Sequence, residues 1–241
     1  MARGRHRLGF GYFNYVTTPV ALALGEGNRV PIRTTHPQSK VSHELVAGSP
    51  NGFLVSKPEA TLSAYVHVPY CRVRCGYCDF NTYTTTELRG VTQSQFVGHV
   101  GLEIELAQKH LVSRGDARAL STVFFGGGTP TLLPANELVS VLASLRVAFG
   151  LEPDAEVTVE ANPDTVSSQY FDELVAGGVT RVSFGVQSAV PHVLATLDRT
   201  HDTLRVPAVL EHARAAGLAT SVDLIYGTPG ETLEDWAASL D

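Results

Sequence analysis

Cysteine is scarce in this sequence of 241 residues, and long hydrophobic runs are missing. The three cysteines lie within one short segment, whereas a secreted disulfide framework spreads an even number along the chain. No window approaches the roughly 18 to 20 consecutive apolar residues of a membrane span, so no membrane insertion is expected. No apolar run closed by a cleavage site follows the arginine-rich N-terminus, and no secretory signal is predicted. Three clustered thiols are typical of a reducing, cytoplasmic location and of a metal site.

The composition also excludes disorder, because 44% of the residues are apolar and 17% are charged. The net charge of −6 is unevenly distributed. Residues 1–60 hold seven Lys and Arg against three Asp and Glu, whereas residues 61–241 hold eleven against twenty-one. Such a break indicates a boundary. We predict an N-terminal extension over residues 1–60, largely irregular with one short apolar element near Val20–Leu24, and a core domain over residues 61–241.

The basic N-terminus raises the question of nucleic-acid binding. Its arginines are not interleaved with aromatic residues, as a nucleic-acid surface would require. We therefore expect a solvated tail and no nucleic-acid partner.

From residue 61 onward, short β-type runs alternate with longer helical patterns. Strands are predicted over Ala64–Val68, Thr122–Phe125, Ala155–Glu160, Thr180–Gly185 and Ser221–Ile225. Repeated strand–helix units predict an α/β fold, in which a parallel sheet with right-handed crossovers forms either a barrel or an open doubly wound sheet.

Between the predicted strands, apolar residues recur at helical spacing. The predicted faces are Phe96, Val100, Ile104, Ala107 and Leu111; Leu138, Leu142, Leu145 and Phe149; Phe171, Leu174 and Val175; and Ala208, Val209 and Ala213. The glycine pair at 177–178 and Gly217 end the last two of these helices, and Pro207 must lie in a first turn or cause a kink. A final helix begins at Thr232, where Asp235 completes a loose capping box. The chain ends within it, without a sixth strand, so we expect a truncated sheet.

Polar and glycine-rich segments follow the predicted strands. They are Pro69–Cys71, Gly126–Gly128, Glu160–Asn162, Gly185–Gln187 and Tyr226–Gly227. In a parallel barrel, ligands bind where strands end and the loops to the next helices begin. The sequence therefore predicts a site at this edge of the sheet.

The cysteines have the spacing Cys-x3-Cys-x2-Cys, formed by Cys71, Cys75 and Cys78. Three thiolates satisfy three irons of a cubane [4Fe–4S] cluster and leave the fourth iron open to a small ligand. Arg72 and Arg74 lie among the thiols, where positive charge favours the thiolate and offsets the negative charge of a cluster.

Two other interpretations of the cysteines stay open. A structural zinc would need a fourth ligand, which would be His67, Asp79 or a distant histidine. Buried, inert thiols are the other alternative, although their clustering argues against it. His67 is also a possible fourth iron ligand, but a strand histidine held by packing is favoured.

Beyond the cysteines, several blocks resemble the radical S-adenosylmethionine (SAM) superfamily. More narrowly, they are similar to the branch of HemW-type heme chaperones and oxygen-independent coproporphyrinogen III oxidases. The blocks are, in order, Tyr65–Phe80, Phe124–Pro130, Glu160–Pro163, Ser183–Gln187, Leu197–His201 and Asp223–Pro229. The resemblance covers about residues 61–241 and implies a partial (β/α)6-type barrel, truncated after the fifth strand.

The same resemblance implies that the three cysteines hold a [4Fe–4S] cluster and that SAM binds beside it. The implied SAM contacts are Gly127, Gly128, Thr129, Glu160, Gln187, Arg199 and Asp223, with Tyr65 and Tyr77 packing around the ligand. From the residues alone, the glycine run also fits a tight turn, Glu160 a solvated strand end and Arg199 a surface cation. Asp223 interrupts a run typical of buried strands, where an unpaired charge is costly.

One position separates the two groups of the branch. The oxidases resemble Cys-x3-Cys-x2-Cys-x-Cys, whereas Phe80 occupies the last position here, and the form Cys78-Asp79-Phe80-Asn81 is similar to the heme chaperones. The resemblance therefore implies a heme chaperone that binds heme as cargo and passes it to acceptor proteins. An oxygen-independent coproporphyrinogen III oxidase is the alternative, and a structural zinc module is a third. No catalytic residue is assigned.

The sequence assigns no heme ligand. His192, His201 and His212 are candidates, but we expect each of them at the surface. The resemblance places the heme-binding motif of the chaperones beyond residue 241.

Overall fold

The computed structural model describes residues 20–25, 61–84, 87–88 and 91–241, and the predicted extension over residues 1–19 and 26–60 lies outside this part of the chain. A six-stranded sheet forms its centre, in the order β1-β2-β5-β6-β7-β8. These strands are β1 (Val20–Gly25), β2 (Thr61–Val68), β5 (Leu120–Gly127), β6 (Leu151–Ala161), β7 (Arg181–Gln187) and β8 (Ala219–Leu224). The apolar element near Val20–Leu24 is β1, which pairs antiparallel with β2. The other five strands run parallel, so every strand predicted from residue 61 onward is confirmed.

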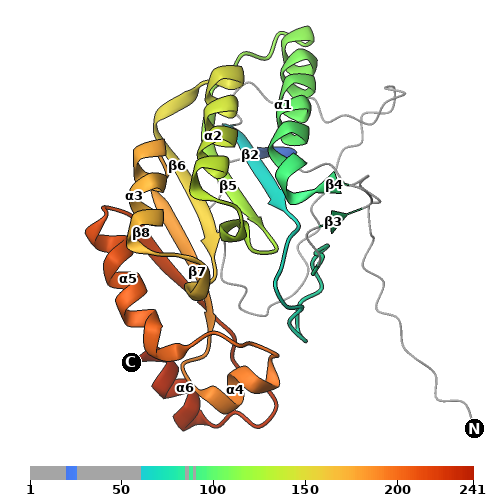
Figure 1. Cartoon of the computed structure of the whole chain (residues 1–241). Helices are drawn as coiled ribbons and strands as arrows, with labels where there is room; N and C mark the ends of the chain where they lie inside the picture. Colours follow the sequence, from blue (N-terminus) through green and yellow to red (C-terminus); the bar gives the residue numbers. More distant parts are fainter. Residues whose placement is uncertain (1–19, 26–60, 85–86, 89–90) are drawn as a thin grey trace, which may run out of the picture.

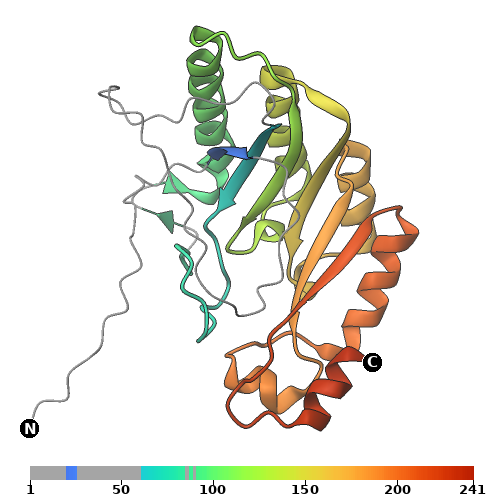
Figure 2. The ribbon, with the colours of Figure 1, turned by 180° about the vertical axis from the view of Figure 1, so that it is seen from behind.

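At least one helix lies between each two consecutive parallel strands in the sequence, and a further helix follows β8. The helices are α1 (Phe96–Ser113), α2 (Ala135–Phe149), α3 (Ser168–Gly177), α4 (Pro191–Thr196), α5 (Val206–Ala215) and α6 (Leu233–Leu240). Figure 1 shows α1, α2, α3 and α5 over one face of the sheet, and Figure 2 shows that none of the described helices covers the other face. This is the predicted α/β fold, a partial barrel of five parallel strands with crossover helices. A small hairpin of β3 (Glu87–Leu88) and β4 (Val91–Thr92) precedes α1.

The core lies between the sheet and its helices because side chains alternate along each strand. In β2 the alternate residues Leu62, Ala64, Val66 and Val68 are all buried. They join Phe125 of β5 and the inner faces of the helices in one continuous apolar cluster. The apolar pattern of the strands thus fixes which face the helices cover.

The face of the sheet that lies away from the described helices carries polar side chains. Arg181 Nη2 donates to Ser221 Oγ at 2.7 Å, Ser221 Oγ lies 2.8 Å from Ser183 Oγ, and Ser183 donates to Asp223 Oδ2 at 3.2 Å. The prediction that Asp223 lies in a buried run is wrong, since its side chain is exposed. The reason is that β8 is the edge strand of the sheet, so its outer side has no neighbouring strand among the described residues.

Two predicted helix-face residues are also exposed rather than buried, Val175 and Ala208. Each is adjacent in sequence to a residue that is buried, Leu174 and Val209 respectively. Neighbouring residues point about 100° apart around a helix axis, so a single supporting surface buries only one of each pair. The predicted helix ends are confirmed, since Gly178 caps α3 in the left-handed conformation and Thr232 forms a capping box with Asp235.

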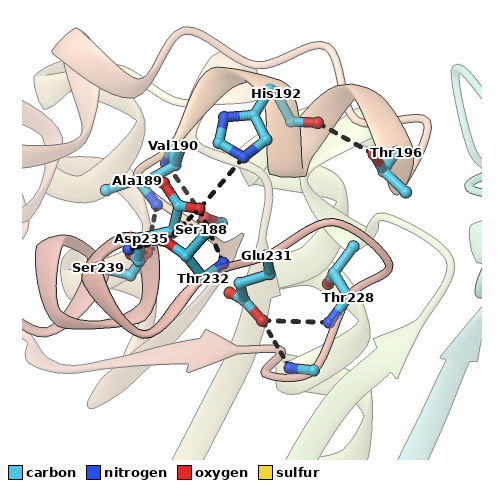
Figure 3. Close-up of polar contacts among 11 residues, drawn as sticks. Ser188, Ala189, Val190, His192, Thr196, Thr228, Glu231, Thr232, Asp235 and Ser239 are labelled. Atoms are coloured by element: carbon cyan, nitrogen blue, oxygen red, sulfur yellow. Dashed lines mark hydrogen bonds and ion pairs between the residues drawn. The ribbon is translucent and has the colours of Figure 1, made fainter.

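The carboxyl ends of the parallel strands meet at one edge of the sheet, where α4, α6 and the cysteine segment also lie (Figure 1). Polar contacts join α6 to the segment that follows β7 (Figure 3). Ser239 Oγ lies 3.1 Å from Ser188 Oγ and accepts from the Ala189 N–H at 3.1 Å, and His192 Nε2 lies 3.2 Å from Asp235 Oδ2. These contacts fix α6 beside the strand ends.

Among the three candidate histidines, His192 and His212 are exposed as predicted, whereas His201 is not. His201 is 6% exposed, because its loop between α4 and α5 places it close to Asp164, in the segment that follows β6. Over the same described ranges, no helix is both long enough and apolar enough to span a bilayer.

Candidate cofactor site

The cysteine segment forms a loop directly after β2, and backbone hydrogen bonds close its base. Cys71 N–H donates to Tyr83 O at 2.9 Å, and Tyr83 N–H donates to Pro69 O at 2.7 Å. Within the loop, Cys78 N–H donates to Cys75 O at 3.1 Å and makes a tight turn. The loop is therefore anchored at its ends. All three thiols are partly exposed, and none of them forms a disulfide bond.

The glycine loop after β5 packs against the base of the cysteine loop. Gly128 N–H donates to Val68 O and Thr129 N–H donates to Tyr70 O, both at 2.7 Å. A Cβ atom on Gly128 would lie 2.5 Å from Tyr70 O and 2.9 Å from Cys71 Sγ. Only a residue without a side chain permits this approach, which explains a glycine here by close packing as well as by the turn.

Local hydrogen bonds act on the first thiol. Burial raises the pKa of the Cys71 thiol, and hydrogen bonds to the side chains of Thr82 and Thr129 oppose that shift. Within the described ranges, no three His, Cys, Asp or Glu side chains converge to hold a single metal ion. A cubane cluster does not require such convergence, because each thiolate binds a separate iron.

A cavity of about 410 Å³ opens beside the three cysteines. Its lining contains every predicted site residue except Tyr65: Cys71, Cys75, Tyr77, Cys78, Gly127, Gly128, Thr129, Glu160, Gln187, Arg199 and Asp223. These residues come from the ends of all five parallel strands and from the loop after α4. The edge predicted from the strand ends is thus one continuous site.

Tyr65 lies next to the cavity on the polar face of β2. Its hydroxyl lies 3.0 Å from His67 Nδ1, and its ring stacks at 6.1 Å on Phe124. Burial, and then the nearby Glu160 carboxylate, raise the pKa of Tyr65 to about 12. His67 Nε2 lies 3.0 Å from Asn81 O, so both ring nitrogens of His67 already have partners and it is a packed strand histidine, as favoured from the sequence.

Glu160 faces the cavity from the end of β6. Its carboxylate accepts a hydrogen bond from Gly127 N–H at 3.2 Å. Burial raises the pKa of Glu160, the Gly127 hydrogen bond opposes that shift, and nearby Asp223 adds to it. A partly desolvated carboxylate of this kind favours a cationic or hydrogen-bond-donating ligand.

Arg199 joins the loop after α4 to the cysteine loop. Its Nη2 donates to Gly185 O, and its Nη1 lies 3.7 Å from Cys75 Sγ. Its Nε is buried without a hydrogen-bond partner among the described residues. The guanidinium therefore holds two loops together and keeps one donor free.

Gln187 and Asp198 are the two residues other than glycine that the described chain places at positive φ, +66° and +54°. Both line the cavity. Such conformations cost on the order of 1–3 kcal/mol and concentrate at functional sites.

Asp198 is a cavity residue that the sequence analysis did not predict. Its Oδ2 would lie 2.5 Å from a Cβ on Gly76, so its carboxylate lies against the cysteine loop. The only sequence signal was its place beside Arg199.

Known proteins resemble this chain in sequence and in fold. Residues 65–241 match the family model described as the radical SAM superfamily. The chain belongs to this superfamily. The radical SAM match begins at Tyr65 in β2 and covers all five parallel strands together with every residue of the predicted site.

Curated relatives within the radical SAM group lie close in sequence. The chain is 46% identical over 189 residues to "Heme chaperone HemW" of Mycobacterium tuberculosis, covering 78% of this chain and 47% of that protein. It is 36% identical over 176 residues to "Heme chaperone HemW" of Escherichia coli, covering 72% of this chain and 45% of that protein. The chain thus spans less than half the length of these relatives.

A solved radical SAM structure has the same fold. The coproporphyrinogen III oxidase HemN from Escherichia coli superposes with a TM-score of 0.62 at 33% identity, covering 73% of this chain and 39% of that one. Radical SAM membership implies a [4Fe–4S] cluster and SAM as cofactors.

Proposed function

We propose that this protein is a radical SAM-type heme chaperone, which holds a [4Fe–4S] cluster and SAM and passes heme to acceptor proteins. The single observation that carries the proposal is the cavity in which three cysteines, a glycine loop and the ends of β6, β7 and β8 converge. The two curated relatives described above are both named heme chaperones. A reducing cytoplasm, in which the three thiols stay free for metal, is the location we propose.

The thiols of Cys71, Cys75 and Cys78 would hold the cluster. The site fits a cluster, because the donor set consists of three thiols. Gly128 has no side chain that would crowd the Cys71 sulfur. Arg199 Nη1 lies 3.7 Å from Cys75 Sγ, where its positive charge would offset the negative charge of a thiolate-bound cluster. When bound, the cluster would supply one-electron chemistry at an iron open to a small ligand.

The acidic residues of the cavity suit the cationic parts of SAM. Glu160 and Asp223 would accept hydrogen bonds from its amino or hydroxyl groups, and the backbone of Gly127–Thr129 would approach its methionine part. Arg199 has a buried, unpartnered Nε that would pair with a carboxylate. Gln187, fixed at positive φ beside Arg199, would complete the contacts. Tyr77 would pack over the ligand, and Tyr65 would support Glu160 from behind.

A coproporphyrinogen III oxidase is the alternative, and the fold shared with the oxidase HemN supports it. Phe80 argues against the oxidase, because it occupies the position at which the oxidase motif has its fourth cysteine. The phenyl ring is 67% exposed and lines the cavity, and it offers no ligand to a metal.

The test uses the full-length protein, reconstituted with iron and sulfide without oxygen. One sample receives heme, and a second receives coproporphyrinogen III with SAM and a reductant. We expect a shift of the heme Soret band and no conversion of the porphyrinogen; conversion to protoporphyrinogen would contradict the chaperone assignment. The Cys75→Ala variant should lose the visible absorption of the cluster, whereas Ser144→Ala, on the exposed side of α2, should keep it.

A further inference from the structure

The tip of the cysteine loop combines exposed apolar side chains with two arginines. Phe80, Val73 and Tyr77 are 67%, 47% and 41% exposed. Arg72 and Arg74 are exposed as well, and all five residues line the cavity. Exposed side chains that also line a cavity stand at its mouth. We refer to these five residues as the cysteine-loop rim.

The rim differs in composition from ordinary surface. Single exposed apolar residues need no explanation, whereas three within eight positions at the mouth of a cavity form a patch of the kind that binds ligands. Arg74 Nη2 donates to Thr82 O at 2.5 Å, which holds this guanidinium within the patch. A guanidinium has five N–H donors, so Arg74 keeps others for a ligand.

Most charges in the cavity fall on two walls, although Arg199 lies between the walls and the Asp198 carboxylate lies against Gly76 of the cysteine loop. Carboxylates line the cavity from the sheet edge and the loops beside it, at Glu160, Asp164, Asp198 and Asp223. The charged residues that the cysteine loop contributes to the lining are both arginines, Arg72 and Arg74. This is unusual in a region, residues 61–241, that holds eleven basic against twenty-one acidic residues. A cationic ligand therefore fits the sheet wall, and an anionic ligand fits the rim.

We propose that the cysteine-loop rim receives the carboxylates and one apolar face of a tetrapyrrole. Heme is a flat apolar macrocycle with two propionate groups, and coproporphyrinogen has four. Arg72 and Arg74 would form charge-assisted hydrogen bonds with propionates, and Phe80 and Val73 would contact the ring. This inference rests on the proposed function for its cargo, but it adds the place where the cargo is held and the chemistry that recognises it.

The rim separates the tetrapyrrole from SAM within one cavity. SAM would occupy the acidic wall, and the tetrapyrrole would lie across the mouth, in contact with the loop that holds the cluster. A bound tetrapyrrole would therefore cover the cluster side of the cavity without displacing Glu160 or Gln187. The same recognition serves heme or coproporphyrinogen, because both carry propionates on an apolar ring.

The experiment titrates the full-length, cluster-loaded protein with heme and with heme dimethyl ester, whose carboxylates are blocked, and follows the Soret band. The ester should bind the unmodified protein at least about tenfold more weakly than heme, since charge-assisted hydrogen bonds are lost. The double variant Arg72→Gln, Arg74→Gln should weaken heme by a similar factor and leave the ester unchanged. Phe80→Ser should weaken both ligands. Arg214→Gln, an exposed arginine on α5, is the matched control and should change neither.

The outcomes separate this inference from the proposed function. Wild-type protein that binds heme and ester equally, or a loaded double variant that binds heme like Arg214→Gln, overturns the rim and leaves the chaperone assignment standing. Wild-type protein that binds neither heme nor coproporphyrin overturns both. The ester comparison needs no substitution, so it tests propionate recognition even if the double variant loses iron, and unchanged binding of heme and ester by Phe80→Ser would then overturn the rim.

Discussion

Arg199 Nη1 lies 3.7 Å from the Sγ of Cys75, although 124 residues separate them in the chain. The same guanidinium donates to Gly185 O at the end of β7. One side chain thus ties the cysteine loop, which follows β2, to the far half of the sheet. The site is assembled from both halves of the parallel sheet, and its geometry depends on this link.

Substitution of Arg199 tests that link. Arg199→Gln should weaken SAM binding roughly 10- to 100-fold, because a hydrogen bond to a charged group is worth about 1.5–3 kcal/mol. Arg199→Lys should rescue only part of the loss, since an ammonium cannot contact Gly185 O and the ligand in the fork geometry of a guanidinium. Calorimetry on the anaerobic, cluster-loaded protein measures both. Unchanged SAM affinity in Arg199→Gln would remove this residue from the site.

Gly128→Ala should damage the cysteine loop. The new Cβ would lie 2.5 Å from Tyr70 O and 2.9 Å from Cys71 Sγ, so backbone must move. We expect a loss of about 1–3 kcal/mol in stability, typical of overpacking, together with a lower iron content after reconstitution. Gly98→Ala is the control, because nothing lies within 4 Å of its Cβ and α1 gains a better helix former. Equal melting temperatures and iron contents in the two variants would contradict the close packing.

Glu160 predicts a pH dependence of stability in the absence of ligands. Burial raises its folded-state pKa above the ordinary value of 4.5. At pH values between the ordinary pKa and the raised folded-state pKa, the folded protein binds more protons than the unfolded chain. The free energy of unfolding therefore falls as pH rises through this range. Glu160→Gln should therefore stabilise the ligand-free protein at about pH 7, by on the order of 1 kcal/mol, and not below the ordinary carboxyl range.

Urea unfolding at neutral and at acidic pH measures this difference. The proteins compared are wild type, Glu160→Gln and the exposed control Glu105→Gln. A destabilised Glu160→Gln protein at neutral pH would show that the Gly127 hydrogen bond outweighs the burial of the charge. The same variant should bind SAM more weakly, since the carboxylate is the proposed acceptor. Stability and affinity should therefore change in opposite directions.

His201 should make the protein sensitive to mild acid. Burial, and then the positive charge of Arg199, lower the pKa of His201 below its ordinary value of 6.5, while Asp164 and Asp202 oppose the shift. Its ring nitrogens have no hydrogen-bond partner among the described residues. With a lowered folded-state pKa, the unfolded chain binds more protons just below the ordinary value, so stability falls as pH drops through that range.

The His201→Phe variant keeps a buried ring without a titrating group, so its unfolding midpoint should depend less on pH between about 7 and 5 than that of wild type. His212→Phe, at an exposed position on α5, serves as control and should retain the wild-type slope. Identical slopes in all three proteins would show that His201 is not charged on unfolding in this range.

Local patterns in the sequence were sufficient to predict the order of the elements and the edge of the sheet at which the candidate site lies. Alternating β-type runs and helical patterns fixed five parallel strands, and side-chain alternation in β2 fixed the face that the helices cover. The spacing of Cys71, Cys75 and Cys78 places them in one loop whatever the rest of the chain does. These are local properties, carried by neighbouring residues, and local sequence is sufficient for them.

Other features depend on contacts between residues that are far apart in the chain, and local patterns did not predict them. Asp223 is exposed because β8 lies at the edge of the sheet, and His201 is buried in a loop close to Asp164 of a distant segment. Neither follows from the neighbouring residues. The positive φ of Asp198 and its place against Gly76 are fixed by contacts between segments about 120 residues apart, and such contacts form only when the chain closes. Burial, charge separation and strain are properties of the folded surface, which a local pattern does not specify.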